Sequence, residues 1–163
     1  MPTASLVSLS DGQVRTRFER LTTFLDHWGD VEAFDLGRNQ PVRLLEFRLS
    51  GPGAELAPEI QGLYREYYRR EVRGDWAIAK YTYEYLDLLR GWRLGYHLHS
   101  LSGTERVPHA HCERADTIPE TERSGHLRAH EFDLREAHQE FIRLWAAGTA
   151  PDCSRFLPLA IQR

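Results

Sequence analysis

The chain has 163 residues, enough for one domain with a hydrophobic core but too few for two well-formed domains. Hydrophobic residues make up 41% and charged residues 28%, as in ordinary globular proteins, and no apolar run is long enough to span a bilayer, so we expect no membrane partner. The formal net charge of −3 argues against a protein that holds nucleic acid on a broad cationic surface, but it leaves a local basic groove open.

The N-terminus and the cysteines indicate the compartment. Residues 1–12 contain neither a basic leader nor an apolar stretch of signal-peptide length, so we expect a cytoplasmic protein. The chain has two cysteines, Cys112 and Cys153, at unrelated positions. In a chain without a secretion signal we expect both to be reduced thiols.

The first third of the chain predicts one helix and one strand. Apolar residues recur at helical spacing within 14–28, although the alternation of polar and apolar residues at 14–18 also fits a strand. Residues 41–49 are rich in strand formers, and the cluster Gly51-Pro52-Gly53 ends them. We therefore expect residues 1–50 to form an N-terminal extension that contains a helix and a strand.

The next segment, Pro58 to Val72, predicts a second helix. Its apolar residues Ile60, Leu63 and Tyr67 follow a helical period. Proline is acceptable in the first turn of a helix, and Gly74 follows the last periodic residue, as a helix C-terminus often requires.

The remaining pattern predicts a β-meander and a closing helix. Residues 80–85 alternate between aromatic and polar types, as expected of a strand with one buried face. Further strands are predicted at 92–100, 107–113 and 126–132, and a capping box at 133–136 begins a helix that ends near Gly148.

These elements together predict a single α+β domain over residues 1–163. We expect an antiparallel four- or five-stranded β-meander packed against two or three helices. The helix, meander and helix core should occupy residues 55–147, and the proline-containing tail at 148–163 should be irregular.

Clustered histidines are the strongest pointer to chemistry. Seven of the eight histidines fall between His97 and His138. Two H-x-H pairs stand out, His97 with His99 and His109 with His111. Imidazole changes its charge near neutral pH and is the commonest metal ligand, so the cluster predicts a functional site.

Whether the two pairs meet depends on strand register. Symmetric closure of the turn at 88–91 sets Thr82 opposite His97. At the second turn, a two-residue loop would direct the second H-x-H pair into the tyrosine face. A three-residue loop with a glycine bulge instead sets His97 opposite His109 and His99 opposite Val107. We favour this second register, because it gathers apolar residues on one face and four histidines on the other.

One chemistry open to such a site is acid–base catalysis without a metal or other cofactor. One neutral histidine takes a proton from a nucleophilic hydroxyl, and a protonated histidine donates to the leaving group. We assign this base and acid pair to His97 and His109, with Lys80 or Arg106 stabilising the charge of a phosphorane. This chemistry would suit cleavage of a phosphodiester.

The alternative chemistry is metal binding, by zinc or another divalent transition metal. Two H-x-H pairs on adjacent strands present up to four imidazoles within reach of one ion. An ion could bind three of the histidines His97, His99, His109 and His111, with Glu84 or Glu113 completing the shell.

Residues 76–147 also resemble a known family. The stretches that carry the resemblance are Tyr81-Thr82-Tyr83, Tyr96-His97-Leu98-His99, Pro108-His109-Ala110-His111 and the helix opening Asp133-Leu134. They look like the TumE-type toxins of bacterial toxin–antitoxin operons, and the order of elements is similar to the RelE and EndoU group of small ribonucleases. The resemblance implies a toxin-like, metal-independent endoribonuclease acting on RNA phosphodiesters, with a cognate antitoxin or operon partner. A non-enzymatic interaction or accessory module remains a third interpretation, since fold-level analogy does not supply function.

Overall fold

The computed structural model describes residues 8–51, 60–89, 91–100, 106–114, 127–128 and 133–145. Within these ranges one antiparallel sheet contains six long strands and a two-residue seventh, each paired with the next in chain order. The strands are β1 (Asp30–Leu36), β2 (Val42–Ser50), β3 (Ile60–Arg70), β4 (Trp76–Asp87), β5 (Trp92–Ser100), β6 (Arg106–Arg114) and β7 (Leu127–Arg128). The helices are α1 (Asp11–Asp26) and α2 (Leu134–Trp145). The α+β class is confirmed, but the sheet is larger than the four or five strands predicted.

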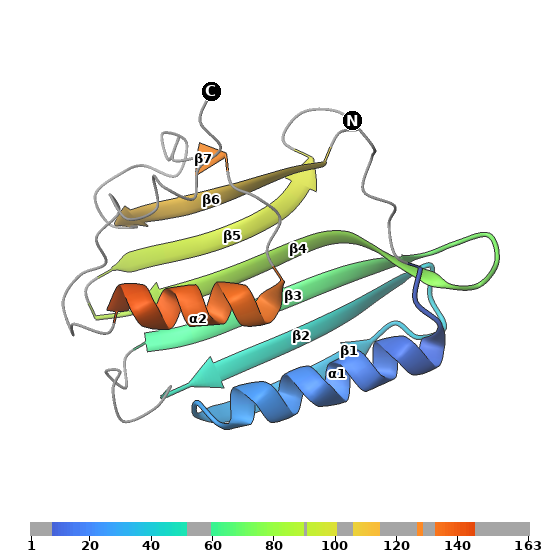
Figure 1. Cartoon of the computed structure of the whole chain (residues 1–163), viewed down its shortest axis with the longest axis horizontal. Coiled ribbons are helices and arrows are strands. Elements are labelled where there is room, and N and C mark those ends of the chain that lie inside the picture. Colours follow the sequence, from blue (N-terminus) through green and yellow to red (C-terminus); the bar gives the residue numbers. More distant parts are fainter. Residues whose placement is uncertain are drawn as a thin grey trace.

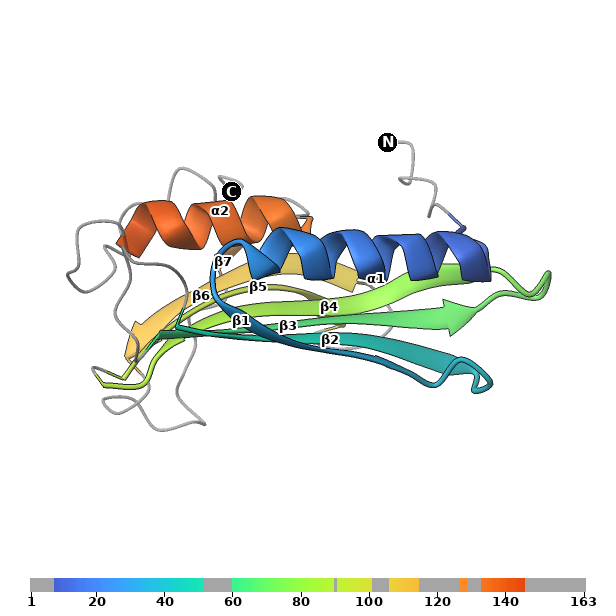
Figure 2. The same ribbon diagram turned by 90° about the horizontal axis from the view of Figure 1, so that it is seen from below.

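Both helices lie on the same face of the sheet (Figures 1 and 2). We call this side the helical face and the opposite side the open face. Helix α1 runs along the β1 and β2 side, and α2 lies over the middle of the meander. In the described part of the chain, no helix or strand packs on the open face.

Tyrosine rings make up much of the core on the helical face. The strand registers align Tyr64 with Tyr83 and Tyr83 with Tyr96, and all three side chains are buried. Phe141 of α2 stacks on Tyr96 with ring centroids 5.3 Å apart. Burying such rings removes a large apolar area from water, so this face holds the domain together.

A partly buried ion pair fixes α1 to the sheet. Arg17 of α1 donates from Nε to Glu66 Oε2 of β3 at 2.8 Å, and the hydroxyls of Tyr68 and Tyr83 donate to the same carboxylate. Burial by itself would raise the pKa of Glu66, but the hydrogen bonds and charge of Arg17 outweigh it and lower the pKa. The carboxylate therefore stays ionised within the core.

The predicted helix at 58–72 is wrong, because this segment forms β3. The buried residues of β3 alternate along the strand and include Gly62 and Glu66, which do not mark an apolar face. A Cβ at Gly62 would lie 2.7 Å from the ring of Tyr64, so glycine makes room for that ring. Glu66 enters the core only because groups distant in sequence neutralise it.

The outcomes for the other segments vary. The helix predicted at 14–28 is confirmed as α1 and the strand at 41–49 as β2, whereas β1 was not predicted. The strand predicted at 126–132 is described at residues 127–128 as β7, and residues 148–163 lie outside the described ranges. In the ranges that the structure covers, no helix is both long and apolar enough to cross a membrane.

Cys112 differs from its expected reduced state, since it forms a disulfide bond. The chain's other cysteine, Cys153, lies outside the described residues. Cys112 follows Ala110 on the helical face of β6, a position that the spacing of cysteines along the chain does not reveal.

Candidate functional site

Strand register brings the two H-x-H pairs together. Thr82 pairs with His97 across β4 and β5, and His97 pairs with His109 across β5 and β6, with His99 opposite Val107. This is the register predicted from the sequence, and it places all four histidines on the open face. The turn at 101–105 lies outside the described residues, so the loop type stays a prediction.

The four imidazoles form a compact cluster. Ring centroids are 4.6 Å apart for His99 and His109, 4.7 Å for His97 and His111, and 5.4 Å for His97 and His109. One ligand atom from each of His97, His99 and His109 lies within 4.8 Å of the other two. His99 is half-buried and the other three rings are buried, so rigid strands and burial hold the cluster.

A glycine in β5 shapes the cluster. Gly95 lies two residues before His97 on the open face, opposite Glu84 in β4 and His111 in β6. A Cβ at this position would lie 3.0 Å from Nε2 of His97 and 3.6 Å from Cγ of Glu84. The missing side chain therefore lets the His97 ring lie over the strand towards Glu84. Sequence reasoning missed Gly95, although a glycine inside a strand pattern often marks a close approach.

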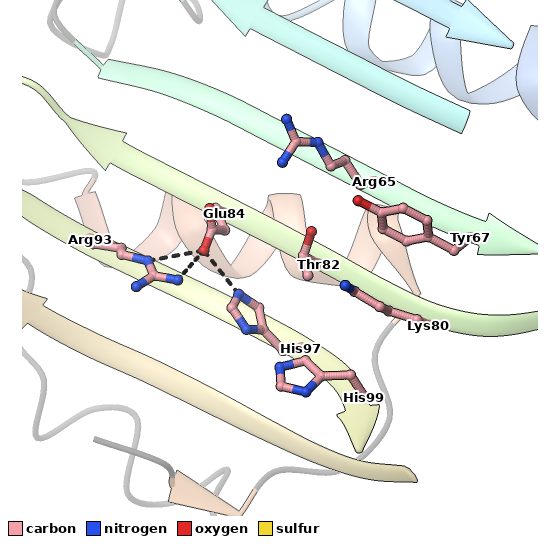
Figure 3. A pocket seen from close by; sticks show the side chains of 8 residues that line it. All are labelled: Arg65, Tyr67, Lys80, Thr82, Glu84, Arg93, His97 and His99. Carbon is pink, nitrogen blue, oxygen red and sulfur yellow. Dashed lines mark hydrogen bonds and ion pairs between the residues drawn. The ribbon is translucent and has the colours of Figure 1, made fainter. Parts of the chain in front are cut away.

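Glu84 and Arg93 orient His97 (Figure 3). Oε1 of Glu84 lies 3.0 Å from Nε2 of His97 and 2.9 Å from Nε of Arg93. Burial would raise the pKa of Glu84, but the hydrogen bond to His97 and the charge of Arg93 lower it to about 2. Because the carboxylate is ionised, Nε2 must be the donor of this hydrogen bond. Nδ1 of a neutral His97 ring therefore carries the lone pair.

A hollow of about 490 Å³ lies beside the cluster on the open face. Figure 3 shows its lining, which comes from three neighbouring strands: Arg65 and Tyr67 of β3, Lys80, Thr82 and Glu84 of β4, and Arg93, His97 and His99 of β5. His109 and His111 do not line it. The contribution of β3 was missed because that segment was predicted to be a helix.

The cations of the hollow differ in how they are neutralised. Arg65 donates from Nε to Glu46 Oε2 at 2.7 Å, and Arg93 donates from Nε to Glu84 Oε1. Lys80 forms no ion pair with any residue that the structure describes, and its Nζ lies 4.7 Å from the ring centroid of Tyr67.

The other predicted site residues are placed only in part. Arg106 pairs with Ser100 and Glu113 pairs with Arg93 in the β5–β6 register, but the side chains of Arg106 and Glu113 lie outside the described part of the structure.

His138 belongs to the core and not to the cluster. It lies on α2, fully buried, with Nδ1 2.7 Å from the hydroxyl of Tyr64 and with edge contacts to the rings of Phe24 and Trp28. Burial lowers its pKa to about 4, so the ring is neutral at pH 7. His138 helps to pack α2 against α1 and the sheet.

Comparison with protein-family models, curated proteins and solved structures gives no match for this chain. Its chemistry must therefore be inferred from its own residues. The described site combines three close imidazoles, one oriented by a carboxylate, with a hollow that holds a lysine without an ion-pair partner among the described residues. It is suited to binding a metal ion, to acid–base chemistry and to receiving an anion.

Proposed function

We propose that His97, His99 and His109 bind one divalent transition-metal ion, such as zinc, with its open side towards the hollow. The observation that carries this proposal is the approach of one ligand atom from each ring to within 4.8 Å of the others. Three protein ligands and one open position are typical of catalytic zinc sites, where the metal acts as a Lewis acid.

The distances between the ligand atoms of the three histidines suit a metal-free site that contracts slightly when the metal ion binds. Zinc–nitrogen bonds of about 2.0–2.1 Å in a tetrahedron place nitrogens about 3.3 Å apart, which small rotations of the rings can reach. Glu84 holds Nε2 of His97, as carboxylates commonly hold the second nitrogen of a metal-binding histidine. The opposite nitrogen, Nδ1, is then available as a ligand.

The position of His109 favours metal binding over its assignment as a general acid. A general acid must come within hydrogen-bond reach of the substrate. His109 is 1% exposed and does not line the hollow, whereas His97 and His99 do. A metal ligand needs no such exposure, so His109 fits as the rear ligand of a centre that His97 and His99 complete.

The test is metal analysis of protein purified without a histidine tag. We expect about one zinc or cobalt ion per chain after reconstitution, and loss of this ion in His99→Ala. His27→Ala is the matched control, because His27 lies at the end of α1 away from the cluster. A chain that takes up no stoichiometric metal, or a His99→Ala variant that binds as the parent does, would contradict the proposal.

A second candidate function is metal-free cleavage of RNA, as the likeness to TumE-type toxins implies. It is favoured by the oriented His97, which lines the same hollow as Lys80. His97 would take the proton of the attacking 2′-hydroxyl, and His99, which also lines the hollow, is better placed than His109 to protonate the leaving oxygen. Cleavage of single-stranded RNA in excess chelator that is lost in His97→Ala would support this function. Cleavage that only added metal restores would instead assign the reaction to the metal centre.

A further inference from the structure

We infer that the hollow beside the histidine cluster binds a phosphate group, with Lys80 as its principal anchor, so that the ligand of this site is a phosphate ester. The inference rests on the proposed metal centre for the role of the phosphate, but binding of the phosphate itself needs only the hollow and its lysine.

Charge is the first support. Arg65 and Arg93 already face carboxylates, Glu46 and Glu84, so an incoming anion would have to compete for them. Among the described residues Lys80 has no such carboxylate, so an anion that pairs with it displaces none; its Nζ instead lies 4.7 Å from the ring centroid of Tyr67. Lys80 is half-buried, and a charge that is partly shielded from water attracts an anion more strongly than a fully exposed one.

The arrangement of donors is the second support. Figure 3 shows Lys80 and Thr82 side by side on β4, with His99 beside them on β5 and Tyr67 on β3. The ammonium and two hydroxyl groups therefore line one hollow from two strands. A phosphate has several strong acceptor oxygens, and donors that approach from different directions satisfy more than one of them.

The position of the hollow next to the histidine cluster is the third support for a phosphate site. Tyr81 pairs with Leu98, so the side chains of their neighbours Lys80 and His99 lie on the open face of adjacent strands. A phosphate held by Lys80 would therefore lie against the imidazoles of the proposed metal site. The hollow has about 490 Å³, within the roughly 300–1,000 Å³ of small-molecule sites.

Lys80 is the chain's one lysine, which makes the test selective. Reductive methylation with ¹³C-formaldehyde keeps the positive charge and leaves two NMR signals, one from Lys80 and one from the terminal amine. In metal-free protein we expect inorganic phosphate to shift the Lys80 signal saturably, and to leave the terminal amine unshifted. Potassium chloride at matched ionic strength should shift neither signal. Equal responses to chloride and phosphate, or no response, would overturn the inference.

Variants of the unmodified protein complete the test by calorimetry. Lys80→Gln should weaken phosphate binding at least tenfold, Lys80→Arg should keep most of it, and Arg20→Gln, on the exposed side of α1, should change nothing. Unchanged phosphate binding in Lys80→Gln would overturn the inference. Metal uptake is measured separately in the same variants, so phosphate binding without metal uptake would reject the metal centre and retain the phosphate site.

Two further arms identify the source of the phosphate. Phenyl phosphate represents monoesters, and a short 2′-O-methyl oligonucleotide represents uncleavable RNA. If phenyl phosphate competes with inorganic phosphate, the ligand is a small phosphomonoester. If the oligonucleotide competes, the ligand is a nucleic-acid phosphodiester. Failure of both to compete would contradict a phosphate-ester ligand.

Discussion

Adding one methyl group at Gly95 should weaken metal binding while the fold stays intact. The new Cβ would lie 3.0 Å from Nε2 of His97, so the ring has to move by a few tenths of an ångström. The same nitrogen lies 3.0 Å from Oε1 of Glu84, and the displacement lengthens or breaks that hydrogen bond. Loss of the partner that orients a metal-binding histidine typically costs about 10–100-fold in affinity, so we expect a drop of about tenfold or more in Gly95→Ala.

The assay is a zinc competition titration against a chromophoric chelator, paired with urea unfolding of the metal-free protein. Replacing glycine in a strand removes backbone freedom from the unfolded chain, a gain of about 0.5–1 kcal/mol that partly offsets the local crowding. Gly12→Ala, whose Cβ would meet its nearest atom at 3.9 Å, is the matched control and should bind zinc as the parent does. Parental zinc affinity in a folded Gly95→Ala variant would show that the glycine does not set the position of His97.

Three other substitutions test the cluster and the core. Glu84→Gln should lower zinc affinity about 10–100-fold in the same titration, since an amide holds Nε2 of His97 less strongly than a carboxylate. Unchanged zinc affinity would exclude an orienting role for Glu84. His138 has a folded pKa of about 4, below the unfolded value near 6.5, so the unfolded chain binds the proton first and stability should fall between pH 6.5 and 4 by up to about 3 kcal/mol. Urea unfolding at pH 7 and 4.5 should show a smaller pH dependence in His138→Phe, and an equal dependence would refute the burial argument. Glu66→Leu should destabilise the domain by about 3–5 kcal/mol because it leaves Arg17 without its carboxylate, and near-parental unfolding in urea would contradict that estimate.

The meander was predictable where the polar and apolar pattern is clear. Alternation around Tyr83 and Tyr96 identified β4 and β5, and the requirement that apolar residues share one face selected the register between His97 and His109. The gathering of histidines on one face followed from that register, whereas the α+β class followed from the predicted helices and strands.

The segment β3 was not predictable from its own residues. Its buried positions include Gly62, which accommodates a ring, and Glu66, which Arg17 neutralises from 49 residues away. Local patterns carry no information on such distant partners, and the spacing of Ile60, Leu63 and Tyr67 suggested a helical period instead. The same error hid the contribution of Arg65 and Tyr67 to the hollow.

The candidate site was predictable as a cluster but not in its division of roles. Sequence reasoning paired His97 with His109 as base and acid, whereas the burial of His109 and its absence from the lining of the hollow favour a ligand behind His97 and His99. The contact of Glu84 with His97, which depends on space left by Gly95, requires side-chain placement that strand periodicity does not provide.

X-ray absorption spectroscopy at the zinc edge, on tag-free protein reconstituted with one equivalent of zinc, tests the proposed centre most directly. We predict a shell that contains about three imidazole nitrogens at about 2.0–2.1 Å, together with light-atom ligands from solvent or an anion. His99→Ala should lose this imidazole shell and His27→Ala should retain it. Zinc coordinated mainly by carboxylates and water, or an identical spectrum in His99→Ala, would contradict a metal centre built on His97, His99 and His109.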